Sequence, residues 1–123
     1  MSNILIVDDS MTMRQMVNFT LSSAGHTVTE AGNTDEALLT AQRQRFDLVI
    51  SDVNMPGRSG IELVGELRKL AEYKFVPIIL LTTESQPEMK SKGRAAGATG
   101  WIVKPFDPEA LLGVLRKVLP AAE

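Results

Sequence analysis

Residues 3–10 read Asn-Ile-Leu-Ile-Val-Asp-Asp-Ser, so four consecutive aliphatic side chains are followed at once by two carboxylates. A run this short and this continuously apolar is typical of a strand covered on both faces, as in a parallel sheet. Similar runs recur along the chain, and we expect strands at 3–7, 27–30, 47–51, 77–82 and 99–103. The run at 27–30 alternates apolar and polar residues, which predicts a half-exposed edge strand.

Helix signals lie between these apolar runs. Apolar residues recur at helical spacing between residues 13 and 24. Capping-box patterns at Asn33, Ser59 and Ser85 predict three further helix starts. Asp107 followed by Pro108 predicts the start of the last helix, which we expect to end at residues 119–120.

A strand and a helix therefore alternate five times. This order predicts an α/β protein built from right-handed βαβ units, with a parallel sheet and helices on both of its faces. The chain of 123 residues suits one domain, and we expect a single domain over 1–123 with no output domain.

The composition excludes several classes of protein. The chain has no cysteine, which rules out thiol catalysis, disulfide frameworks and cysteine-based metal sites. A formal net charge of −2 argues against a surface built for nucleic acid. No apolar run reaches the roughly 18 residues of a membrane span, and the N-terminus has no signal-peptide pattern, so we expect a cytoplasmic protein.

Polar side chains follow four of the five predicted strands, at the point where each strand ends. They are Asp8 and Asp9, Asp52, Thr82 and Lys104. The carboxyl ends of parallel strands share one edge of the sheet, where ligands bind in open α/β folds. If the first and third strands are neighbours, Asp8, Asp9 and Asp52 meet in one crevice. Three carboxylates at close range repel one another, and oxygen ligands without histidine or cysteine favour a hard cation such as Mg²⁺. A divalent ion and a lysine beside a carboxylate suit phosphoryl chemistry.

Other phosphate and nucleophile motifs are absent from the sequence. There is no G-x-x-x-x-G-K-[ST] loop, no G-x-G-x-x-G after a strand and no G-x-S-x-G elbow. The one histidine, His26, precedes the predicted edge strand and lies at the opposite edge from the acidic residues. A nucleotide site at the first turn and a Ser-His hydrolase are therefore disfavoured.

Four motifs, in this order and at these strand ends, resemble the receiver domain of bacterial two-component response regulators. They are Val7-Asp8-Asp9-Ser10, Ser51-Asp52-Val53-Asn54-Met55-Pro56-Gly57, Leu81-Thr82-Thr83, and Gly97-Ala98-Thr99-Gly100-Trp101 leading to Lys104-Pro105-Phe106. The resemblance covers essentially the whole chain and is greatest to the stand-alone chemotaxis type, the CheY-like proteins. It implies a flavodoxin-like (CheY-like) three-layer sandwich, with a five-stranded parallel sheet of order 2-1-3-4-5 and five helices.

The resemblance also implies a role for each site residue. Asp52 corresponds to the aspartate that accepts phosphate from a histidine kinase. Asp8 and Asp9 correspond to the acidic pair that holds Mg²⁺, or Mn²⁺ in its place, with Asp9 as the more direct ligand and Asp52 as a further one. The backbone carbonyl of Asn54 is expected to complete the protein's share of the metal shell. Lys104 is expected to contact the phosphoryl group.

The expected switch uses a hydroxyl and an aromatic ring. Thr82 is expected to turn toward the new phosphoryl charge, and Trp101, where the family more often has Tyr or Phe, to turn inward behind it. Asn54 and Glu84 lie where the family tunes the lifetime of the acyl phosphate. The peptide bond between Lys104 and Pro105 is expected to be cis.

The resemblance implies partners rather than a substrate. We expect a histidine kinase of the chemotaxis (CheA) type upstream and a flagellar motor switch protein or another protein target downstream. A phosphatase is a further candidate partner, whereas nucleic acid and membrane are not, and we expect a monomer. The protein is expected to be no enzyme beyond self-phosphorylation and autodephosphorylation.

Three alternatives stay open. A phosphate sink or a non-motility phosphorelay regulator would have a similar sequence. A magnesium-dependent phosphohydrolase would share the acidic site, although the short loops provide no lid and the D-x-D pattern of aspartyl-phosphate phosphatases is absent. A binding module that never uses phosphate would leave the complete acidic site without a purpose.

Overall fold

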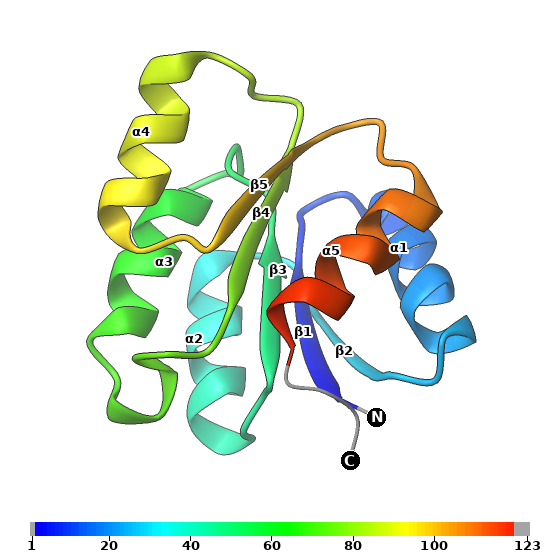
Figure 1. The fold of residues 1–123 in the computed structure, drawn as a ribbon. Coiled ribbons are helices and arrows are strands. Elements are labelled where there is room, and N and C mark those ends of the chain that lie inside the picture. Colours follow the sequence, from blue (N-terminus) through cyan, green and yellow to red (C-terminus); the bar gives the residue numbers. More distant parts are fainter. Residues whose placement is uncertain (1, 120–123) are drawn as a thin grey trace.

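The computed structural model describes residues 2–119 and contains one five-stranded parallel sheet of order β2-β1-β3-β4-β5 (Figure 1). The strands are β1 (Asn3–Val7), β2 (Thr27–Ala31), β3 (Leu48–Ser51), β4 (Ile78–Thr82) and β5 (Gly100–Val103). The helices are α1 (Met11–Ser23), α2 (Thr34–Arg43), α3 (Gly60–Arg68), α4 (Pro87–Ala96) and α5 (Pro108–Val118). The predicted fold class and strand order are confirmed. Pro120, the predicted stop of the last helix, lies outside the described residues.

The sheet is covered on both faces, which explains its continuously apolar strands. In β1, Leu5 and Val7 pack into one core cluster, and Ile4 and Ile6 pack into the other. Helices α2, α3 and α4 cover the first cluster, and α1 and α5 cover the second (Figure 1). The edge strand β2 is only half-buried, as its alternating sequence predicted.

Three of the four predicted helix starts are confirmed, including Asp107 as the N-cap of α5 with Pro108 at its first position, and one is not. Ser59 and Glu62 form a complete capping box at α3, and Asn33 caps α2 by accepting the N–H of Glu36. The capping box predicted at Ser85 is wrong, because α4 starts at Pro87 with Gln86 as its N-cap. Proline favours the first helical position, where its missing N–H is not needed, and this leaves Ser85 outside the helix.

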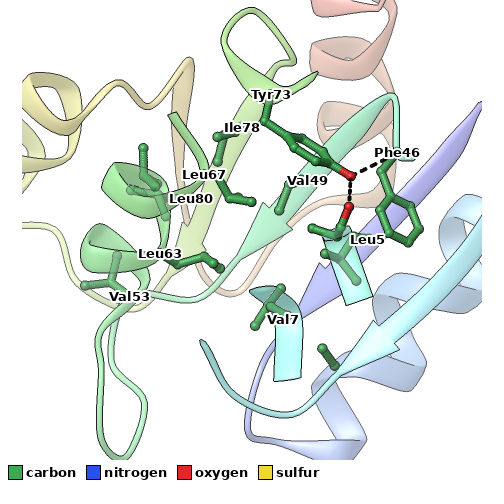
Figure 2. Packing of buried hydrophobic residues seen from close by; sticks show 14 residues of the cluster. Leu5, Val7, Phe46, Val49, Val53, Leu63, Leu67, Tyr73, Ile78 and Leu80 are labelled. Carbon is green, nitrogen blue, oxygen red and sulfur yellow. Dashed lines mark hydrogen bonds between the residues drawn. The ribbon is translucent and has the colours of Figure 1, made fainter. Parts of the chain in front are cut away.

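A short 3₁₀ helix, η1 (Ala71–Tyr73), precedes β4 and was not predicted. The Tyr73 hydroxyl lies in the core, where it donates toward the carbonyl of Ala41 over 2.8 Å and accepts the N–H of Phe46 over 3.3 Å (Figure 2). These bonds join η1 to the connection between α2 and β3. They satisfy a buried hydroxyl that would otherwise be costly to bury.

The Arg68 guanidinium fastens the end of α3 to two neighbouring turns. It donates to the carbonyls of Tyr73 and Val76 over 2.7 and 2.6 Å, and twice to the carbonyl of Gly97 over 3.0 and 2.7 Å. Gly97 caps α4 with φ of +114°, a left-handed conformation that glycine adopts freely. Burial lowers the pKa of Arg68 from its usual value, because desolvation disfavours the charged form.

None of the helices within residues 2–119 combines the length and the apolar character that a bilayer span requires.

Candidate functional site

The register of the sheet brings four strand ends together at one edge. Val7 of β1 is paired with Ser51 of β3, so the next residues, Asp8 and Asp52, are neighbours. The N–H of Asp52 donates to the carbonyl of Val7 over 2.9 Å. At the carboxyl ends of β4 and β5, the N–H of Lys104 donates to the carbonyl of Thr82 over 2.8 Å. All the predicted strand-end residues therefore meet at the same edge.

Three carboxylates form a cluster at this edge. Asp8, Asp9 and Asp52 each turn one oxygen to within 4.8 Å of the others. Asp8 and Asp52 are buried, at 4% and 9% exposure, whereas Asp9 is exposed. An oxygen-only set of this kind fits a hard divalent cation, which would also offset the repulsion between the carboxylates.

The Lys104 ammonium lies between two of the three carboxylates. Its Nζ is 2.8 Å from Oδ2 of Asp8 and 3.2 Å from Oδ2 of Asp52. Burial alone would lower the pKa of Lys104, but the hydrogen bond to Asp8 and the charges of Asp52 and Asp8 outweigh it and raise the pKa above its ordinary value. Lys104 is therefore a permanent cation at neutral pH. Its peptide bond to Pro105 is cis, as expected.

The carboxylates of Asp8 and Asp9 differ in their hydrogen bonding and in their exposure to solvent. Oδ1 of Asp8 accepts the N–H of Ser10 over 2.9 Å, and Oδ2 accepts the Lys104 ammonium. Both Asp8 oxygens are thus engaged within the protein, whereas Asp9 presents its carboxylate to solvent. Asp9 is therefore the more accessible carboxylate of the pair.

Asp52 is held in place by its neighbours in the chain. Its Oδ1 accepts the N–H of Val53 over 2.7 Å, which leaves Oδ2 directed toward Lys104. Its backbone carbonyl accepts the Ser51 hydroxyl over 2.8 Å. Asn54 follows two residues later and is exposed in the loop before α3. The part expected for the Asn54 carbonyl stays a prediction.

Gly60, the first residue of α3, fits directly against the phosphoacceptor candidate, and sequence reasoning missed it. A Cβ at residue 60 would lie 1.8 Å from the backbone oxygen of Asp52. The Gly60 N–H donates to the carbonyl of Val53 over 2.9 Å, which holds α3 at this distance. A glycine in the first turn of a well-capped helix is a weak signal of such a close backbone approach.

A second hydrogen-bonded chain links Thr82 to Trp101 through one residue. Thr82 is fully buried, and its Oγ1 accepts the N–H of Glu84 over 3.1 Å. The indole Nε1 of Trp101 donates to the carbonyl of Glu84 over 2.9 Å. The backbone of Glu84 thus joins the hydroxyl to the aromatic ring, a connection that the sequence did not reveal.

The Trp101 ring lies against a glycine of α4. A Cβ at Gly93 would come within 2.9 Å of Cζ3 of the indole and 3.1 Å of Cδ1 of Leu80. Gly93 weakens α4 by its low helix propensity, but it leaves the space that the indole fills. The glycine and the tryptophan are therefore complementary features of this chain.

Comparisons with known proteins agree with this geometry. Residues 4–116 match the family model of the response regulator receiver domain. The chain belongs to the response regulator receiver family. A receiver is a phosphoacceptor rather than a conventional enzyme, and its fold is the CheY-like fold described above.

Individual receivers are similar over nearly their whole length. The structure of the Vibrio cholerae chemotaxis protein CheY4 superposes with a TM-score of 0.93 and 55% identity, over 97% of this chain and 99% of that one. Protein PilH of Pseudomonas aeruginosa is 37% identical over 97% of this chain and 98% of its own. The response regulator TrrA of Thermotoga maritima, solved in complex with Mg²⁺ and BeF, has a TM-score of 0.87 and 37% identity, over 97% of this chain and 100% of that one.

Proposed function

We propose that this receiver is a phosphorylation-driven switch in which Asp52 accepts a phosphoryl group from a histidine kinase. A carboxylate oxygen of Asp52 attacks the phosphorus of the phosphohistidine, the P–N bond breaks, and the imidazole leaves with its electron pair and takes up a proton. The observation that supports this best is the cluster of Asp8, Asp9 and Asp52 around the Lys104 ammonium. Water later hydrolyses the acyl phosphate.

The residues of the cluster fit a resident Mg²⁺, with Mn²⁺ as an alternative ion. Asp9 and Asp52 would hold it directly with the backbone carbonyl of Asn54, and Asp8 would complete the acidic set. When bound, the ion supplies positive charge to the phosphoryl oxygens during transfer. Lys104 supplies a second positive charge from the protein, since its ammonium already lies 3.2 Å from Oδ2 of Asp52.

The switch follows from the bonds of Thr82. After phosphorylation the Thr82 hydroxyl turns to donate to a phosphoryl oxygen and so gives up the N–H of Glu84. The carbonyl of Glu84 accepts the indole N–H of Trp101, so the loop that contains Glu84 and the indole ring move together. The surface of α4, β5 and α5 then changes, as a population shift between two states. Asn54 and Glu84 tune how long the modified state lasts.

We further propose chemotaxis as the pathway, with a CheA-type kinase upstream and a separate protein target such as a flagellar motor switch protein. The 55% identity to a chemotaxis protein of Vibrio cholerae supports this proposal. Phosphate sinks and regulators outside motility are the alternative, and a phosphatase is a further candidate partner. A cytoplasmic monomer without an output domain of its own is the form that this proposal requires.

Mass spectrometry tests the phosphorylation step. Incubation with Mg²⁺ and acetyl phosphate should add one phosphoryl group to the wild type and none to Asp52→Asn. Asp47→Asn is the matched control, because Asp47 is an exposed carboxylate that precedes β3, at the opposite edge of the sheet from the cluster. A folded wild type that gains no mass would contradict the proposal, as would equal labelling of the two variants.

A comparative pull-down tests the switch and the pathway together. Protein loaded with Mg²⁺ and beryllofluoride should retain a chemotaxis target that the unloaded protein does not. Thr82→Ala should lose this difference while still being phosphorylated. Equal retention by loaded and unloaded protein would overturn the switch, and selective retention of a non-motility protein would select the alternative pathway.

A further inference from the structure

An arginine outside the acidic cluster donates a hydrogen bond to the peptide group between Asp8 and Asp9. Arg14, in α1, donates from Nη1 to the carbonyl oxygen of Asp8 over 2.6 Å and from Nε to Oε1 of Glu30 over 2.9 Å. Glu30, in β2, is fixed in turn by Asn18, whose Nδ2 donates to Oε2 over 2.8 Å. The Arg14 side chain is only 16% exposed, so its charge lies in a hydrogen-bonded network rather than on a solvated face.

This contact holds the peptide group that precedes the Asp9 side chain. The carbonyl of Asp8 and the amide of Asp9 form one planar unit, so fixing the carbonyl fixes the plane from which Asp9 extends. The N–H of Asp8 is tied to Ala31 of β2 over 3.2 Å, and the Arg14 bond is the tether on its carbonyl side. Asp9 is exposed, so the backbone must provide much of its positioning.

We propose that Arg14 is a positioning residue for the metal-binding pair, acting through the Asp8 carbonyl on the carboxylate of Asp9. The inference rests on the proposed function, because it concerns how that site holds its cation. A partner of this kind is expected to matter, since groups that orient metal ligands typically change metal affinity by about 10- to 100-fold when removed.

Charge and geometry predict opposite results when Arg14 is replaced. A cationic guanidinium close to an acidic site repels a divalent ion, so losing its charge should by itself tighten metal binding. Losing the tether on the Asp8 carbonyl should weaken it. The sign of the change therefore distinguishes a positioning residue from a residue that acts only through the electrostatic field.

Electron paramagnetic resonance of free Mn²⁺ measures the affinity directly. Arg14→Met keeps the aliphatic stem and removes the donors, and it should weaken Mn²⁺ binding by about 10-fold, the lower end of the range for orienting groups. Glu30→Gln combined with Arg14→Met leaves the local net charge of this pair unchanged and should show the same loss. Glu30→Gln alone keeps an acceptor for Arg14 Nε and should bind Mn²⁺ almost as the wild type does. Arg45→Met, at the far edge of the sheet before β3, is the matched control and should also bind normally.

Phosphorylation kinetics give a second measurement that a general loss of stability would not produce. In Arg14→Met the Mg²⁺ concentration for half-maximal labelling by acetyl phosphate should rise by the same factor as the Mn²⁺ dissociation constant. The rate at saturating Mg²⁺ should stay close to that of the wild type. Arg14→Lys keeps the charge but cannot reach both Asp8 and Glu30, so its metal affinity should lie between those of the wild type and Arg14→Met. This variant replaces Arg14→Met in the test if Arg14→Met does not fold.

The possible outcomes separate this inference from the function on which it rests. Unchanged or tighter Mn²⁺ binding in Arg14→Met and in the double variant overturns the positioning role, even if Asp52 is phosphorylated normally. An equal loss in Arg45→Met overturns it as well. A wild type that binds no Mn²⁺, or an Asp9→Asn variant that binds as the wild type does, instead contradicts the metal site itself.

Discussion

Lys104 and Asp8 form an ion pair of 2.8 Å although they are 96 residues apart in the sequence. Both side chains are nearly inaccessible, at 9% and 5% exposure, so water screens the pair only weakly. Their contact joins the first strand of the chain to the loop after the last. The same ammonium also reaches Asp52, so one cation balances two buried carboxylates.

Removing the ammonium should therefore lower the stability of the fold as well as impair the proposed phosphorylation. Lys104→Met leaves two buried carboxylates without their cation, and we expect a loss of about 3 kcal/mol in the free energy of unfolding. The double variant Asp8→Asn with Lys104→Met removes one of the two charges and should recover part of that loss. Urea denaturation at pH 7 measures both, and a single variant as stable as the wild type would contradict the prediction.

Two glycines of α3 should respond oppositely to alanine. At Gly60 the new Cβ would lie 1.8 Å from the backbone oxygen of Asp52, and backbone cannot move aside cheaply. We expect a loss of about 3 kcal/mol, at the upper end of overpacking costs, together with slower phosphorylation. At Gly65 no atom lies within 4 Å of the Cβ position, so alanine should stabilise the helix by up to about 1 kcal/mol. Thermal and urea denaturation of the pair tests this contrast.

Alanine at Gly93 should displace the indole of Trp101. The Cβ would come within 2.9 Å of the half-buried indole and 3.1 Å of the fully buried Leu80, so we expect the indole to shift. Because the chain has one tryptophan, its emission should shift to longer wavelength and its quenching by acrylamide should increase. Gly113→Ala in α5 is the control, since its nearest neighbour is the end of the Arg116 side chain at 3.7 Å. Identical spectra for both variants would refute the packing argument.

The stability of the protein should fall steeply in alkali. Burial raises the pKa of Tyr73 above its usual 10.0, so the folded state keeps a proton that the unfolded state releases as pH rises through that value. The raised pKa of Lys104 acts in the same direction and over a similar range. Stability from both groups is present at neutral pH and is lost as the pH rises above about 10.

Tyr73→Phe separates the two contributions. It should lower stability at pH 7 by about 1–2 kcal/mol, because Phe46 and Ala41 lose a buried hydrogen-bond partner. It should also flatten the decline above pH 10 without abolishing it, since Lys104 remains. Urea midpoints between pH 7 and 11 provide the measurement. A variant with the same alkaline slope as the wild type would show that Tyr73 does not titrate as described.

The sequence predicted the acidic edge well, because it is built from local patterns. Each apolar run is long enough to identify a strand, and four of the five runs end in the polar residues that lie together at the sheet edge. Parallel topology does the rest, since it places all carboxyl ends together. Asp8, Asp9 and Asp52 meet only if β1 and β3 are neighbours, and that strand order was implied by the family resemblance rather than by the local patterns.

The supporting contacts could not be predicted in the same way. These contacts involve backbone atoms, which every residue has. They are the hydrogen bond from Arg14 to the Asp8 carbonyl, the close approach of Gly60 to the Asp52 carbonyl, and the hydrogen bond from the Trp101 indole to the Glu84 carbonyl. Residue identity gives little information about such partners. The start of α4 was missed for another reason, because Pro87 competed with the Ser85 pattern for the same turn.

The position of β1 inside the sheet has a consequence for synthesis on the ribosome. β1 leaves the ribosome before β2 and β3, yet it must pair with both of them and receive Lys104 opposite Asp8. The sheet can begin to assemble while later strands are still being made, but the ammonium that balances Asp8 and Asp52 emerges only after all five strands. Until Lys104 emerges, the nascent chain carries Asp8 and Asp52 without the cation that balances them, so the charge balance of this edge is completed only after its five strands have been made.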